Sequence, residues 1–171
     1  SNYTIKILAS AKLTAPEFDR VIFSRIPNVR LKSRESTAVR RDEEVTREAV
    51  SFIEDQGAKN PFFLFMFYDS SHTYSYPKDY PEVFSEKKEC LNYLSLDGDK
   101  DPAPLLASYK TSLHYVDSLV NRVILSLEKN RLLDDTYIVI TGDHGEEFNE
   151  TKQNSWGHFG AFNRYQTQVP L

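Results

Sequence analysis

The side chains best suited to chemistry lie close together near the end of the 171-residue chain. Asp143 and His144 are adjacent in the stretch GDHGEE, and His158 follows in SWGHFG. A carboxylate and two imidazoles are ligands that Zn²⁺ and Mn²⁺ accept in proteins. Asp143, His144 and His158 are therefore candidate metal ligands. The same spacing is equally compatible with a surface turn that carries a solvated carboxylate.

Two glycines flank this Asp-His pair. Gly142 and Gly145 permit backbone turns that other residues rarely adopt, so the two adjacent side chains could aim at one point. The acidic residues that follow, Glu146 and Glu147, are expected in the first turn of a helix or in solvent.

His72 is a further candidate, because it follows FFLFMFY, the most apolar run of the chain. An imidazole changes its charge near neutral pH, so it can protonate a leaving oxygen or hold an anionic group. We predict that His72 is a catalytic and substrate-binding residue. The ordinary alternative is a packing or surface role in a Tyr-rich loop, which is also what we expect of His114 within its helix.

The order of apolar residues predicts strands that alternate with helices. Short apolar runs indicate the strands, and apolar residues recurring every three or four positions indicate the helices. The expected elements are strand 3–9, helix 42–56, strand 62–68, helix 106–127 and strand 136–141. This order is typical of a parallel sheet with right-handed crossovers. We predict an α/β fold of three layers, α/β/α, with a mainly parallel sheet in a single domain, residues 1–171.

In such a fold ligands bind beyond the carboxyl ends of the strands, where the loops converge. His72 follows strand 62–68, and Asp143 and His144 follow strand 136–141, so all three are expected at one edge of the sheet. The intervening segment 69–104 is rich in Tyr, Pro and charge, and we expect it to be a functional covering loop with at most a short helix near 83–91.

Composition argues against several functions. The net charge of −4 argues against nucleic-acid binding, although the segment 20–41 is locally basic. That segment is either solvated irregular chain or a contact for an anion or lipid headgroup. The sequence shows no membrane-spanning run and no signal peptide. It also lacks the G-x-S-x-G, P-loop and H-E-x-x-H motifs, which argues against serine hydrolases, NTPases and zincins.

Several stretches together resemble the sulfatase branch of the alkaline phosphatase superfamily. They are YIVITGDHGEEF, the preceding helix YKTSLHYVDSLVNRVILSLEKNRLLDDT and the following WGHFG. In that family the Asp-His after this strand and a later His bind the catalytic metal, which implies this role for Asp143, His144 and His158. PFFLFMFYDSSHTYSYP also resembles the segment of lipid phosphoethanolamine transferases and lipoteichoic acid synthases whose histidine, here His72, contacts substrate.

The stretches ILASAKLTAPEFDRVIF and NRYQTQVPL resemble a narrower group, the extracytoplasmic domains of inner-membrane, lipopolysaccharide-associated sulfatase-like proteins of Gram-negative bacteria. This resemblance implies a membrane-anchored parent protein and a location on the periplasmic face of the inner membrane. It further implies an anionic lipid or a sulfate or phosphate ester as the binding partner, and no nucleic acid.

Two features of the family pattern are missing from the chain. These are an N-terminal strand that ends in an acidic metal ligand and, further on, a Thr, Ser or modified Cys nucleophile at a helix N-terminus; neither is present before the strand 3–9. Cys90 lies in KECLNYL, without the Cys-x-Pro-Ser-Arg context that sulfatases need to oxidise their cysteine. We therefore expect residues 1–171 to be a truncated sulfatase-like domain, a fragment that shows no turnover by itself.

The resemblance implies that the intact protein is a metal-dependent hydrolase or transferase of sulfate or phosphate esters. In it, His158 would bind the metal or steady a charged substrate oxygen. The alternative is a non-catalytic domain that binds lipid or lipopolysaccharide. The sequence leaves open which ester is used, whether the group is hydrolysed or transferred, and whether the metal is Zn²⁺, Mn²⁺, Mg²⁺ or Ca²⁺.

Overall fold

The computed structural model describes residues 3–14, 17–27, 29, 33–56, 60–81, 83–84, 92 and 95–170. The chain divides into two compact units. The first contains residues 1–81 and 112–136, and the second contains residues 82–111 and 137–171. None of the helices in the described part of the chain is long and apolar enough to cross a membrane.

The first unit is built on a parallel pair of strands. β1, Thr4–Ala9, pairs with β2, Phe62–Phe67, along their whole length. Between them in sequence lie the short α1, Phe18–Val21, and the long α2, Ala38–Gln56. The 27-residue α3, Ala103–Lys129, follows β2. These elements confirm the first two predicted strands and both predicted helices, with each helix beginning earlier than the periodicity indicates.

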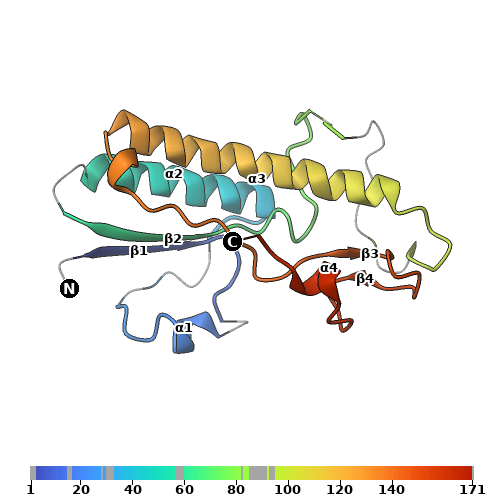
Figure 1. Ribbon diagram of the computed structural model, residues 1–171. Helices are drawn as coiled ribbons and strands as arrows, with labels where there is room; N and C mark the ends of the chain where they lie inside the picture. Colours follow the sequence, from blue (N-terminus) through green and yellow to red (C-terminus); the bar gives the residue numbers. More distant parts are fainter. Residues whose placement is uncertain are drawn as a thin grey trace. The chain divides into compact units, whose positions relative to one another are not determined.

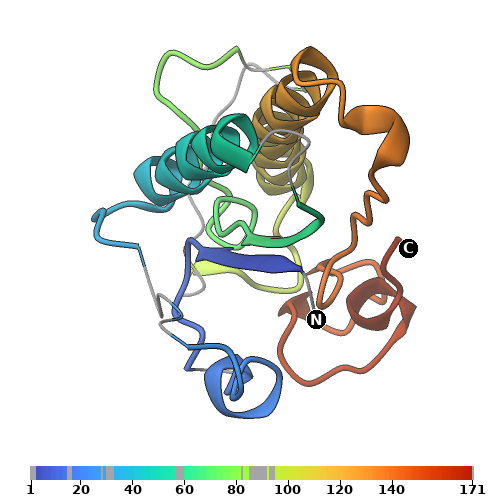
Figure 2. The ribbon, with the colours of Figure 1, turned by 90° about the vertical axis from the view of Figure 1, so that its left-hand side faces the viewer.

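Successive side chains of the two strands point to opposite faces of the sheet, so each face packs against a different segment of the chain. One face packs against the helices, which Figures 1 and 2 show lying side by side over the sheet. Its core consists of Leu8, Val45, Ala49, Ile53, Val123 and Leu127, with Leu64 and Met66 packed against them. The other face carries Ile7 and Ala9, which pack with Leu13 and Phe23 from the segment around α1.

The spacing of the core residues explains why the helices form. Val45, Ala49 and Ile53 recur every four residues in α2 and are all fully buried, which places them on one stripe of the helix. Residues Leu119, Val123 and Leu127 form the matching stripe of α3. These residues cover one face of β1 and β2, as expected of parallel strands, which need helices to shield them from water.

Residues 136–141 do not form the predicted third strand. They pair with no strand in the described part of the chain, and the side chains of Tyr137 and Val139 are 101% and 74% exposed. A run of β-branched and aromatic residues favours a pleated surface, but a strand also needs a neighbour for its amide and carbonyl groups. The prediction of a strand at 136–141 was wrong, because the composition of the segment does not provide a neighbouring strand.

The second unit contains a small hairpin. β3, Glu147–Phe148, pairs antiparallel with β4, Trp156–Gly157. The turn between them has positive φ angles at Asn149, Lys152 and Asn154. The short α4, Arg164–Thr167, follows and is capped by Asn163, whose side chain accepts from two backbone amides. In the predicted covering segment 69–104, residues 85–91, which contain Cys90 and most of the short helix predicted near 83–91, fall outside the described residues.

Candidate metal and ester site

The three predicted metal ligands lie together in the second unit. The imidazole rings of His144 and His158 stack, with ring centroids 4.0 Å apart and planes at 30°. Oδ1 of Asp143 lies 3.7 Å from Nε2 of His144. The Asp143 side chain is 51% exposed, whereas that of His158 is only 14% exposed. The site is therefore accessible to solvent beside the Asp143 carboxylate and largely shielded from solvent beside His158.

Each imidazole has its Nδ1 atom next to an oxygen that can only accept a hydrogen bond. Nδ1 of His144 lies 2.9 Å from the carbonyl oxygen of Gly145. Nδ1 of His158 lies 3.0 Å from Oε2 of Glu146. Because neither oxygen carries a proton to give, Nδ1 must be the donor in both bonds. Each neutral ring then keeps its lone pair on Nε2.

This arrangement fits a divalent metal ion. Histidines that bind metals almost always donate their other ring N–H to a carboxylate or a backbone carbonyl, which fixes the tautomer and the ring orientation. His144 and His158 show both versions of this bond. With the neighbouring carboxylate of Asp143, they offer the mixed nitrogen and oxygen donors that Zn²⁺ and Mn²⁺ accept. The role of all three as ligands stays a prediction.

The structure requires a glycine at position 145 for a different reason from the predicted one. A Cβ atom on Gly145 would lie 2.1 Å from the carbonyl oxygen of Tyr165. The amide of Gly145 also donates to the carbonyl of Gln166 at 2.8 Å. Close backbone approach to α4, rather than an unusual turn, therefore requires a glycine at position 145. This contact joins the Asp-His stretch to the segment after His158.

The acidic pair Glu146-Glu147 is buried, and the prediction of helical or solvent-exposed groups was wrong. The Glu146 side chain is 5% exposed and contacts His158. Glu147 is completely buried in β3. Both carboxylates find hydrogen-bond donors 8 to 19 residues further along the chain. No local sequence signal predicts such partners.

Glu147 is the hydrogen-bonding centre of the hairpin. Its Oε1 atom accepts from the Thr151 hydroxyl, and its Oε2 atom accepts from Ser155, Asn163 and Gln166 at 2.7–3.0 Å. Burial by itself raises the pKa of this carboxyl, but these four hydrogen bonds outweigh it, and the pKa lies below its usual range. Glu147 thus ties β3, the β3–β4 turn and α4 together around the two histidines.

His72 lies in the first unit, in the turn that follows β2. Its amide donates to the carbonyl of Asp69 at 3.2 Å, and its side chain is exposed. The turn is anchored from α2, because the buried Asp42 accepts from the amides of Asp69 and Ser70 at 3.0 and 2.8 Å. Arg41 pairs with the carboxylate of Asp69. The backbone of the turn that carries His72 is therefore fixed by hydrogen bonds and an ion pair. The catalytic role of His72 stays a prediction.

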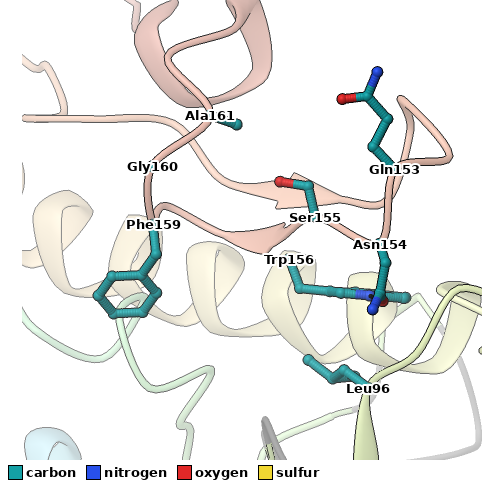
Figure 3. Close-up of a pocket in the computed structure, with 8 residues that line it drawn as sticks. All are labelled: Leu96, Gln153, Asn154, Ser155, Trp156, Phe159, Gly160 and Ala161. Atoms are coloured by element: carbon teal, nitrogen blue, oxygen red, sulfur yellow. Dashed lines mark hydrogen bonds between the residues drawn. The ribbon is translucent and has the colours of Figure 1, made fainter.

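A hollow of about 480 Å³ borders the loop that carries His158. Figure 3 shows its lining residues, which come from the β3–β4 turn, β4, the loop after β4 and Leu96. They are Leu96, Gln153, Asn154, Ser155, Trp156, Phe159, Gly160 and Ala161. None of them carries a charge. The indole Nε1 of Trp156 donates to Asn154 at 3.0 Å, which fixes the ring, while the Phe159 ring is 68% exposed.

Other sequence candidates have ordinary packing roles. Nδ1 of His114 and the hydroxyl of Tyr80 share a 2.6 Å hydrogen bond, and both residues belong to the first unit. In the basic segment 20–41, Arg20 pairs with Glu17 at 3.0 Å and Arg41 pairs with Asp69. The prediction that this segment contacts an anion or a lipid headgroup stays untested.

Comparison with known proteins identifies the family of the chain. Residues 6–171 match the sulfatase family. The chain therefore belongs to the sulfatase family, and the predicted resemblance to this branch is confirmed. Among curated proteins, it is 25% identical to iduronate 2-sulfatase of Mus musculus, over 76% of this chain and 29% of that protein. It is 24% identical to iduronate 2-sulfatase of Homo sapiens, over 76% of this chain and 30% of that protein. The chain thus spans under a third of these relatives.

Proposed function

We propose that the intact protein is a metal-dependent hydrolase of sulfate esters, with Asp143, His144 and His158 as ligands of the metal. The observation that carries this proposal is the pair of stacked imidazoles, each with Nδ1 bonded to an acceptor, beside an exposed carboxylate. Membership in the sulfatase family supports the same reaction. The carboxylate and the two Nε2 atoms are the kinds of donor such a site needs.

A divalent ion at this site would act as a Lewis acid on a sulfuryl oxygen and would stabilise the charge that develops during ester cleavage. His144 and His158 provide rigid nitrogen donors, because their Nδ1 hydrogen bonds prevent the rings from turning. Asp143 offsets part of the positive charge on the open side of the site. His72 protonates the leaving oxygen or holds the anionic group, as an imidazole can near neutral pH.

The hollow beside the loop of His158 suits the part of the ester that does not react. Its lining combines aromatic rings with amide and hydroxyl groups and has no charge, which favours a neutral, hydroxyl-rich group such as a sugar ring. A lipid-linked substrate and a periplasmic, membrane-anchored location, which the narrower sequence resemblance implies, remain part of the proposal.

Hydrolysis of matched model esters tests this proposal. We expect the intact protein to cleave an aryl sulfate, to lose that activity on treatment with a chelator, and to regain it with Zn²⁺, Mn²⁺, Mg²⁺ or Ca²⁺. The matched aryl phosphate should be cleaved more slowly. Faster cleavage of the phosphate would replace the sulfate ester by a phosphate ester as substrate. A metal-loaded protein that cleaves neither ester nor transfers either group would contradict the catalytic function.

Replacement of His72 by alanine tests its role separately. Because this imidazole is expected to serve the substrate oxygen and not the metal, His72→Ala should lower turnover by roughly 10²–10⁴-fold and leave metal content unchanged. Turnover and bound metal are measured on the same preparation. His114→Ala, which changes a histidine in α3, is the control and should retain activity. Loss of metal in His72→Ala would show that His72 is a metal ligand. Unchanged turnover would show that His72 has only a packing role.

A further inference from the structure

Glu146 occupies an unusual position beside the two histidines. Its carboxylate is almost wholly buried, and the same oxygen, Oε2, lies 3.0 Å from Nδ1 of His158 and 4.0 Å from Nδ1 of His144. Burial and the negative charge of Glu146 together raise the pKa of Tyr109, which belongs to the same unit. The carboxylate therefore lies beside an imidazole pair and is largely shielded from water.

A buried carboxylate is costly unless its partner compensates for the lost hydration. The exposed Asp143 and Glu150 in the same stretch avoid this cost by facing solvent. Glu146 instead contacts His158, an imidazole that is itself largely buried. The four hydrogen bonds that join β3, the turn and α4 are made by Glu147 and do not involve the carboxylate of Glu146.

We propose that Glu146 is the positioning residue of His158. Its carboxylate accepts the Nδ1–H bond, holds the ring in the tautomer with a free lone pair on Nε2, and makes that nitrogen a stronger donor toward a divalent cation. This inference deepens the proposed function and rests on it, since it assumes that His158 is a metal ligand. Glu146 itself does not contact the metal or the substrate.

The two histidines differ in a way that makes this inference testable. The Nδ1–H of His144 donates to the backbone carbonyl of Gly145, so no side-chain replacement removes its acceptor. The Nδ1–H of His158 donates to a side chain, which can be replaced. A carboxylate acceptor also strengthens the ring nitrogen as a donor more than a neutral carbonyl does, because it stabilises positive charge on the imidazole. Changes at Glu146 should therefore affect His158 and leave the tautomer of His144 unchanged.

The experiment compares Glu146→Ala and Glu146→Gln with the intact wild-type protein. Selective ¹⁵N labelling of histidine reports the tautomer of His158 in metal-free protein at alkaline pH, with His158→Asn used to assign its signals. Competition with a chelator then measures the affinity for Zn²⁺ and Mn²⁺. Glu150→Gln, the same chemical change at an exposed residue of the same stretch, is the control.

We expect Glu146→Ala to shift His158 toward the Nε2–H tautomer and to weaken metal binding by roughly 10–100-fold. Glu146→Gln keeps an acceptor oxygen but removes the charge, so it should retain the tautomer and lose less affinity. Glu150→Gln should change neither quantity. If Glu146→Ala leaves the His158 tautomer or the metal affinity unchanged, the inference is overturned and Glu146 is only a buried packing partner. Absence of metal binding by the wild type would instead contradict the proposed function, and the tautomer result would still decide whether Glu146 orients His158.

Discussion

Replacing Asp143 by alanine in the intact protein is expected to remove the bound divalent ion and to lower sulfate-ester turnover on the order of 10³-fold or more. A metal ion contributes several kcal/mol of charge stabilisation to the transition state of such a reaction. Asp143 is the only negatively charged member of the proposed ligand set. Without it, this ligand set contains only two neutral imidazoles, and no anion contacts the cation directly.

The exposure of Asp143 separates this effect from misfolding. Its side chain is half exposed and approaches His144 only at 3.7 Å, so its removal should cost little folding stability. Turnover, metal content and the midpoint of thermal unfolding are measured together. Asp134→Ala, at another exposed aspartate, should change none of the three. A variant at position 143 that retains both its metal and its turnover would exclude Asp143 as a ligand.

Replacing Glu147 by alanine is expected to lower the free energy of unfolding of its unit by about 3–5 kcal/mol. The change removes the acceptor of four hydrogen bonds and leaves the donors from Thr151, Ser155, Asn163 and Gln166 without their partner. Urea unfolding measures the loss. Glu150→Ala, at an exposed residue of the same hairpin whose carboxylate accepts one hydrogen bond, from the amide of Phe148, should change stability by less.

The Glu147→Gln variant separates the contribution of the negative charge of Glu147 from that of the shape and hydrogen-bonding capacity of its side chain. An amide whose oxygen takes the place of Oε2 keeps the bonds from Ser155, Asn163 and Gln166, and the Thr151 hydroxyl can turn to accept from the new amide group. Bonds to a neutral acceptor are weaker than bonds to a carboxylate. We therefore expect a smaller loss, about 1–2 kcal/mol. Equal losses in Glu147→Gln and Glu147→Ala would show that the charge, and not the number of bonds, dominates.

The lowered pKa of Glu147 also predicts how stability depends on pH. The unfolded carboxyl has a pKa near its ordinary value of 4.5, and the folded carboxyl has a lower pKa. The folded state then binds fewer protons than the unfolded state between these two values. The contribution of Glu147 to stability is fully present above the unfolded pKa and is lost as pH falls through the folded pKa. Acid unfolding of Glu147→Gln should lack this component, and an unchanged acid transition would contradict the prediction.

The sequence by itself determined the helices and strands that are specified by patterns of neighbouring residues. The four-residue spacing of Val45, Ala49 and Ile53 required an amphipathic helix, and the matching stripe of α3 required a second one. The apolar run 62–67 required a strand covered on both faces. The order of these elements fixed an α/β class, and the motifs GDHGEE and WGHFG indicated the histidines that the structure brings together.

Only the tertiary structure decided features that depend on partners distant along the chain. Residues 136–141 have the composition of a strand, but no described strand pairs with them, because composition expresses a preference and cannot provide a neighbour. Glu146 and Glu147 follow the charge pattern of a helix start, yet their partners at His158, Asn163 and Gln166 lie 12 to 19 residues away. A local pattern describes what a residue prefers, whereas burial and hydrogen bonding depend on which groups the fold places beside it. For this reason the candidate ligands were predicted from sequence, and the carboxylates that hold them were not.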